Sequence, residues 1–111
     1  MRSDKMTSEN MVGAPLATSA VLMAASKHIS TNCRAENKAF LHCKKTDTNP
    51  EKCLSHGHEV TRCVFSLLRE LHGKCPKEMD SYSGCMNYYG NEFELCRREQ
   101  KQFECACPLN E

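Results

Sequence analysis

The sequence predicts an all-α protein made of two disulfide-stapled antiparallel helical hairpins with an extended N-terminal arm. Eight of its nine cysteines follow one another at intervals of nine to eleven residues along the 111-residue chain. A turn signal stands midway along each group of four, TDTNP at 46–50 and YGN at 89–91. The chain has no Trp and only 6% aromatic residues, so the core is expected to be small and to need cross-links.

The elements are expected in a simple order. Residues 1–32 form a polar N-terminal arm without cysteine, with room for a short helix after Pro15. We expect this arm to be ordered by contacts with other chains. The first hairpin spans 33–63, with its second helix continuing to about residue 72; the second hairpin spans 75–107, and 108–111 form a tail.

Capping residues predict the helix ends of the first hairpin. Thr31 or Asn32 is expected to cap its first helix. In its second helix, Asn49 is the expected N-cap and Pro50 the first helical residue. Gly73 suits the position just after that helix ends.

The second hairpin is expected to begin near Pro76 and to turn at Gly90. Asn91 is the expected cap of its second helix, with Glu94 three residues on as in a capping box. Pro108 lies near the end of that helix.

Apolar residues recur at spacings of three and four, as on one face of a helix. This face comprises Cys53, Gly57, Val60, Val64, Leu67 and Leu71 in the first hairpin, and Met79, Tyr82, Cys85, Met86 and Tyr89 in the second. Leu67, Leu68 and Leu71 extend past the last cysteine of the first hairpin. We interpret them as packing against the second hairpin, with a partner surface as the alternative.

Cysteine spacing predicts bridges between helices rather than within them. Two cysteines ten positions apart on one helix lie about 15 Å apart, beyond the roughly 4.4–6.8 Å between Cα atoms that a disulfide spans. In an antiparallel hairpin, bonded partners lie equally far from the turn. Cys43 with Cys53, and Cys33 with Cys63, are both centred on residue 48, so these nested pairs are predicted.

The same argument applies to the second hairpin, where Cys85 and Cys96 are centred on the turn. Cys75 has two candidate partners, Cys105 and Cys107, which centring does not separate. Helical phase favours Cys107, which lies within about 20° of the face of Cys96, whereas Cys105 lies on the opposite face. We predict the pairs 75–107 and 85–96, with Cys105 as a free thiol. We interpret Cys105 as a small packing residue, with a bond to a partner as the alternative.

Composition argues against several functions. Fifteen basic and fourteen acidic residues leave a net charge of +1, which gives no reason to propose a nucleic acid or an anionic membrane surface as partner. The longest apolar stretch, Pro15–Ala25, is shorter than the ~20 residues of a transmembrane helix. A secretory signal peptide is disfavoured because Asp4 and Glu9 interrupt its basic region.

No motif for metal or redox chemistry stands out. The close ligand pairs are HGH, with His56 and His58, and CAC near the C-terminus. The short Cys-x(2–4)-Cys knuckles of structural zinc sites are absent, so we interpret the two histidines as surface polar residues. A Cys-x-x-Cys redox motif is also absent. We therefore predict no catalytic residue, no metal and no cofactor.

The segments CRAENKAFLHC and CLSHGHEVTRC resemble the twin Cys-x9-Cys hairpins of the coiled-coil-helix-coiled-coil-helix (CHCH) family of the mitochondrial intermembrane space. Two such units, together with NPEKCL, VTRCV and the terminal CPL, are similar to the PGIV-type accessory subunits of respiratory complex I. The resemblance covers roughly residues 15–109, and Cys105 has no counterpart in the family pattern. The family cysteines correspond to Cys33, Cys43, Cys53, Cys63, Cys75, Cys85, Cys96 and Cys107.

This resemblance implies a non-catalytic structural subunit of mitochondrial NADH:ubiquinone oxidoreductase, a respiratory-chain complex of electron transport. The subunit would be peripheral to the inner membrane on its intermembrane-space side, where it would brace or assemble the membrane arm through other complex I subunits. It would be imported without a cleaved presequence and oxidised by the disulfide relay. One alternative is a soluble twin Cys-x9-Cys assembly or metal-delivery factor, and another is a secreted disulfide-rich effector.

Overall fold

The computed structural model describes residues 16–109, and every regular element in that part of the chain is helical. Two hairpins form, α4–α5 and α6–α7, so the predicted all-α fold class is confirmed. In chain order the elements are α2 (Ser19–Ala24), α3 (Ser26–Asn32), α4 (Arg34–Thr46), the 3-10 turn η1 (Pro50–Cys53), α5 (Leu54–Lys74), α6 (Pro76–Tyr88), the 3-10 turn η2 (Phe93–Cys96) and α7 (Arg97–Ala106).

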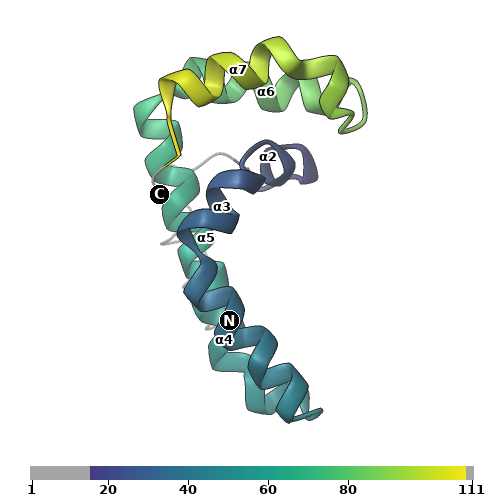
Figure 1. Ribbon diagram of the computed structural model, residues 1–111, viewed down its shortest axis with the longest axis vertical. Coiled ribbons are helices and arrows are strands. Elements are labelled where there is room, and N and C mark those ends of the chain that lie inside the picture. The colour runs from purple at the N-terminus through teal and green to yellow at the C-terminus, as the bar shows by residue number, and fades with distance from the viewer. Residues whose placement is uncertain (1–15, 110–111) are drawn as a thin grey trace.

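The two hairpins meet at an elbow, so that the first projects away from the second (Figure 1). Cys75 breaks the helix there with a φ of -140° and a ψ of 64°, and Pro76 takes the first position of α6. The molecule measures 43 × 28 × 27 Å, with a radius of gyration of 15.0 Å. A compact chain of this length would have roughly 13 Å, so the projecting hairpin makes the molecule elongated.

The apolar core lies around the second hairpin. Its largest fully buried side chains are Tyr82, Phe103, Leu68, Met79 and Met86. Leu67, Leu68 and Leu71 of α5 belong to this core, which confirms that they pack against the second hairpin. By contrast, α4 has no buried residue.

The described part of the N-terminal arm is folded onto this core. α2 lies along α6, and α3 reaches α5 (Figure 1). Ala20, Val21, Ala24 and Ala25 are 8% exposed or less, because their spacing places them on one helix face. Residues 19–32 therefore pack on other helices of this chain, α2 on α6 and α3 on α5, and the expectation that other chains order the arm stays a prediction. Residues 1–15, which the prediction also covered, lie outside the described residues.

The helical region consequently starts earlier than its predicted cap. Thr31 and Asn32 lie inside α3 and cap nothing. Thr18 is the N-cap of α2, where its hydroxyl accepts a 3.3 Å hydrogen bond from the amide of Val21.

The start of the segment η1–α5 was predicted correctly, whereas its end was not. Asn49 caps η1 by accepting a 3.1 Å hydrogen bond from the amide of Glu51, and Pro50 follows it, as predicted. Gly73 does not end the helix but lies within α5. The helix continues because the amide of Cys75 still donates to the Leu71 carbonyl at 2.9 Å.

The turn of the second hairpin lies at Gly90, as predicted, but Asn91 does not cap the following helix. Gly90 and Asn91 both adopt positive φ values, 64° and 68°. The amide of Asn91 donates to the Met86 carbonyl at 2.7 Å, so these residues close the end of α6. η2 begins instead after Glu92, without a side-chain cap.

Candidate functional site: the disulfide framework and exposed surfaces

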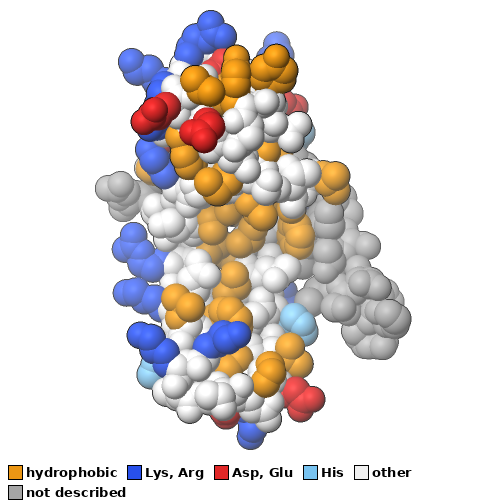
Figure 2. All heavy atoms as spheres, turned by 90° about the vertical axis from the view of Figure 1, so that its right-hand side faces the viewer, with side chains coloured by type: hydrophobic (Ala, Val, Ile, Leu, Met, Phe, Trp, Pro, Cys, Tyr) orange, Lys and Arg blue, Asp and Glu red, His pale blue; other side chains and the backbone are white. Residues whose placement is uncertain are grey.

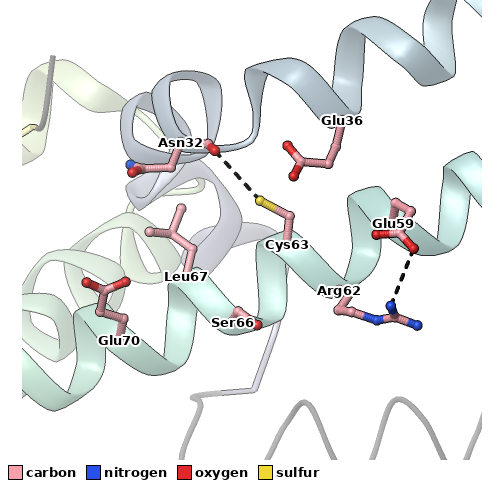
Figure 3. Close-up of a pocket in the computed structure, with 8 residues that line it drawn as sticks. All are labelled: Asn32, Glu36, Glu59, Arg62, Cys63, Ser66, Leu67 and Glu70. Carbon is pink, nitrogen blue, oxygen red and sulfur yellow. Dashed lines mark hydrogen bonds and ion pairs between the residues drawn. The ribbon is translucent and has the colours of Figure 1, made fainter.

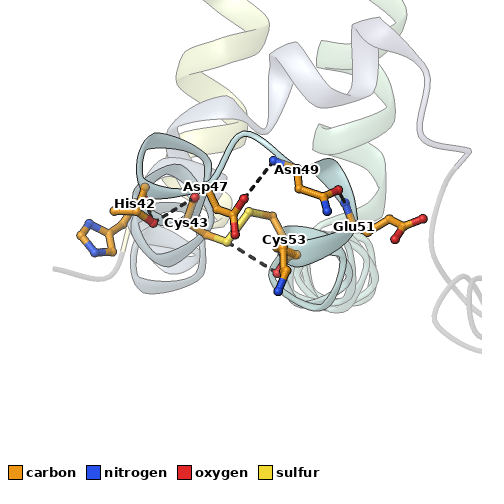
Figure 4. The surroundings of a disulfide bond; sticks show 8 residues. His42, Cys43, Asp47, Asn49, Glu51 and Cys53 are labelled. Carbon is orange, nitrogen blue, oxygen red and sulfur yellow. Dashed lines mark hydrogen bonds between the residues drawn. A yellow bond between two sulfur atoms is a disulfide. The ribbon is translucent and has the colours of Figure 1, made fainter.

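Two disulfides join α4 to the segment η1–α5. Cys33 bonds Cys63, and Cys43 bonds Cys53, with a Cα–Cα distance of 5.9 Å in each pair. The inner bond lies at the hairpin tip (Figure 4), where the carboxylate of Asp47 accepts a 3.0 Å hydrogen bond from the amide of the capping residue. Turn and bridge together close the tip.

Two further disulfides join α6 to η2–α7. Cys75 bonds Cys107 with a Cα–Cα distance of 6.3 Å, and Cys85 bonds Cys96 at 6.0 Å. Cys105 is a free, exposed cysteine. The structure thus brings together the eight cysteines that the spacing argument assigned and leaves Cys105 outside the framework.

Potential metal ligands are few in the described part of the chain. Cys85, Cys96 and Glu99 have ligand atoms within 4.8 Å of one another, but the two sulfurs are bonded to each other. Disulfide sulfurs are not the thiolates that bind metals. His56 and His58 lie near the start of α5, half-buried and exposed respectively, and neither belongs to a cluster of three ligands in residues 16–109.

A buried histidine that the sequence prediction missed joins α3 to the end of the second hairpin. His28 is 2% exposed, and its Nε2 lies 2.7 Å from the carbonyl oxygen of Cys107. A carbonyl only accepts hydrogen bonds, so Nε2 carries the proton. The ring centroid lies 5.0 Å from that of Phe103. The available signal was spacing, because His28 continues the buried row from Ala24 four residues later.

A polar contact reinforces this junction. Lys27 Nζ and Gln100 Nε2 each lie 3.1 Å from the same carboxylate oxygen of Glu104. Partial burial raises the Glu104 pKa, but the hydrogen bonds from Gln100 and Lys27 outweigh it and hold that pKa below its usual 4.5. Burial, and then the charge of Glu104, raise the pKa of Tyr82 above 10.0, while Arg97 opposes the rise. These groups anchor α3 on α7.

A shallow groove runs along α5 beside the junction of α3 and α4 (Figure 3). Arg62 donates a 3.3 Å hydrogen bond to Glu59 at one end. Glu70 lies at the other end and Glu36 points in from α4, so its carboxylates do not converge as a catalytic acid–base pair would. The lining consists of Asn32, Glu36, Glu59, Arg62, Cys63, Ser66, Leu67 and Glu70.

Large apolar side chains remain exposed on both hairpins. Tyr88 and Tyr89, 79% and 45% exposed, stack edge-to-face at the end of α6 with ring centroids 4.8 Å apart. Leu41 and Leu54 of the first hairpin are 58% and 55% exposed. Figure 2 shows hydrophobic side chains on the surface of both the upper and the lower part of the molecule. Tyrosine and aliphatic side chains of this kind are suited to burial by a partner.

None of the described helices combines the length and apolar character that crossing a bilayer requires.

Comparison with known proteins gives three informative relatives, although no family model matches the chain. NADH dehydrogenase (ubiquinone) 1 alpha subcomplex subunit 8-A of Arabidopsis thaliana is 65% identical over 97 residues, which cover 87% of this chain and 90% of that protein. Subunit 8-B of the same plant is 64% identical over 97 residues, covering 87% and 92%. The NADH-ubiquinone oxidoreductase 20.8 kDa subunit of Neurospora crassa is 34% identical over 95 residues, covering 81% of this chain and 51% of that protein.

Proposed function

Because the chain belongs to the alpha subcomplex subunit 8 family of mitochondrial NADH:ubiquinone oxidoreductase (complex I), we propose that it braces the membrane arm of that complex without catalysing a step itself. It is an accessory subunit of complex I, so its partners are other complex I subunits and it associates with the mitochondrial inner membrane. The observation that carries the proposal is 65% identity over 90% of a relative's length.

We place the subunit on the intermembrane-space side of the membrane. The support is its four disulfides, since structural disulfides persist in oxidising compartments and are rare where thiols are kept reduced. Entry would then require oxidation by the disulfide relay of that space. Protease added to mitochondria with ruptured outer membranes should digest the chain. Protection until the inner membrane is dissolved would contradict this location.

The bracing role follows from rigidity and from exposed contact surface. Each bridge contributes roughly 3–4 kcal/mol in the chain-entropy model, which stabilises the folded hairpins despite a small core. Cys75, Cys96 and Cys107 are 3% exposed or less, which shields their bonds from exchange with thiols. The exposed tyrosine pair and leucines then offer apolar contacts to neighbouring subunits.

The proposal is tested by solubilising mitochondria in a gentle detergent and separating complexes by native electrophoresis. The chain should co-migrate with NADH dehydrogenase activity. A small free species only would refute the structural role and favour the soluble assembly or metal-delivery factor. For the non-catalytic claim, variants Cys105→Ser and His58→Ala should assemble and retain ubiquinone reduction per assembled complex. Normal assembly with lost turnover would contradict it.

We further propose the pairs 33–63, 43–53, 75–107 and 85–96 as the native connectivity. Geometry supports them, because the Cα–Cα distances of 5.9–6.3 Å fall within the range that disulfides span. Peptide mapping without reduction, after blocking free thiols, should recover these four cross-links with only Cys105 alkylated. A peptide that joins Cys33 to Cys53 would contradict the nested arrangement.

A further inference from the structure

The overall charge balance conceals a segregation of charge between the two hairpins. Residues 33–63 contain six basic and four acidic residues, for a net charge of +2, whereas residues 75–107 contain four basic and six acidic residues, for a net charge of -2. The net charge of +1 for the whole chain therefore says little about what either surface attracts.

The positive charge of the first hairpin gathers on one side of α4. At about 100° per residue, Arg34, Lys38, Leu41 and Lys45 fall within an arc of about 60°, opposite Cys43, which bonds to the other half of the hairpin. All four are exposed. We call them the cationic face of α4. The acidic residue of this helix, Glu36, lies on the other side, toward α5.

The cations of this face have no anionic partner within residues 16–109. Other basic residues do, since Lys27, Lys74 and Arg98 each form an ion pair with a glutamate. Figure 2 shows Lys and Arg side chains in a column along one edge of the lower part of the molecule, without acidic side chains among them. Among the described residues, no ion pair therefore offsets the positive charge of the cationic face.

We propose that the cationic face of α4 docks on a phospholipid surface that carries anionic headgroups. Charge complementarity identifies the partner, because a row of cations along one helix is attracted to the negative potential of such a surface. From residue 34 to residue 45 the row is about 16 Å long, so several headgroups can meet it at once.

The composition of the face favours a lipid surface over an acidic protein. Leu41 stands among the cations with 58% of its surface exposed. Basic residues mixed with an apolar side chain suit the headgroup–acyl boundary, where the leucine enters and the lysine stems extend toward the phosphates. This contact would add to the subunit contacts proposed above and does not depend on them.

The test is flotation of the oxidised full-length chain with vesicles of neutral phosphatidylcholine, with or without one-third phosphatidylglycerol. The chain should bind the anionic vesicles, fail to bind the neutral ones, and be released at 1 M salt, where the screening length falls to about 3 Å. Each cation removed should weaken partitioning about fivefold. The triple variant Arg34→Gln, Lys38→Gln, Lys45→Gln should therefore bind about a hundredfold more weakly.

A matched control separates the cationic face from net charge. The variant Arg69→Gln, Lys77→Gln, Lys101→Gln removes three exposed cations from other helices and reaches the same net charge. It should keep wild-type partitioning within about fivefold. Circular dichroism and thermal unfolding of both variants should match the wild type. Equal loss of binding in the two variants would overturn the proposal.

Tryptophan fluorescence reports the orientation directly, because the chain contains no Trp. Leu41→Trp should shift to shorter wavelength with anionic vesicles, whereas Tyr88→Trp on the second hairpin should not. A shift at residue 88 alone would overturn the proposal. The proposal would also be overturned if the wild-type chain did not bind vesicles and the α4 triple variant failed to assemble into complex I. That result would assign the cationic face to an acidic protein surface.

Discussion

Replacing His28 with alanine should detach the N-terminal helices from the second hairpin. The change removes the partner 2.7 Å from the Cys107 carbonyl, and a buried polar group left unpaired costs about 1–3 kcal/mol. It also empties the space of a ring that packs 5.0 Å from the Phe103 ring, and large-to-alanine changes in a core cost about 2–5 kcal/mol. Since α2 and α3 can settle partly into the space, we expect a total loss of about 3–4 kcal/mol.

The assay is urea unfolding with all disulfides intact, followed by hydrogen exchange that is read separately for each helix. Exchange should accelerate in α2 and α3 and remain slow in α4. His28→Gln keeps a hydrogen-bond donor but loses the ring, so it should cost about half as much. His58→Ala, at an exposed position, should change the free energy of unfolding by less than about 0.5 kcal/mol. A loss below about 1 kcal/mol for His28→Ala would refute the anchoring role, since it would fall short of the packing cost alone.

Three further results are expected. Gly57→Ala should stabilise the first hairpin by about 0.5–1 kcal/mol in urea unfolding, because a glycine within a helix is costly and the new methyl would meet Phe40 at an ordinary 3.5 Å; destabilisation would contradict this packing. Glu104→Gln should lower the melting temperature at pH 7. This deficit should shrink as the pH falls below the usual carboxyl pKa of 4.5, because a carboxylate whose pKa is depressed in the folded protein loses its stabilising effect once acid protonates it. A deficit that does not vary with pH would argue against the Lys27 contact. Cys105→Ser should abolish maleimide labelling of the unreduced protein and leave the melting temperature unchanged, whereas residual labelling would place a free thiol elsewhere.

The hairpin architecture was predictable because a disulfide imposes a strict distance. Helical cysteines about 15 Å apart on one helix cannot bond each other. Spacing symmetric about residue 48 in the first hairpin and about residues 90–91 in the second leaves few arrangements. Asn49 and Pro50 were predictable as a helix start because both act through their own local backbone. These signals depend on a few adjacent residues and not on the packing of distant segments.

The missed features depend on tertiary context. Ala20, Ala24 and His28 form a buried row, but small residues and a histidine give a weak apolar signal in a polar segment. Asn91 suits both a helix cap and a left-handed turn. In the structure it adopts the turn, where its amide donates a hydrogen bond to the Met86 carbonyl at the end of α6. The cationic face was not predicted for a different reason. The net charge of the whole chain is a sum over all of its surfaces, so it does not reveal a positive charge on one side of one helix.

The two hairpins are stabilised in different ways, because the apolar core lies around only one of them. α2, α3, α6, α7 and the end of α5 surround the buried side chains, whereas α4 contributes none. The first hairpin is therefore held mainly by its two bridges, which close loops of 30 and 10 residues. A helix held by cross-links does not need an apolar outer face to stay folded, so the outward side of α4 is free to carry charge. The covalent framework thus allows one hairpin to project from the core and to present a charged surface that its own stability does not require.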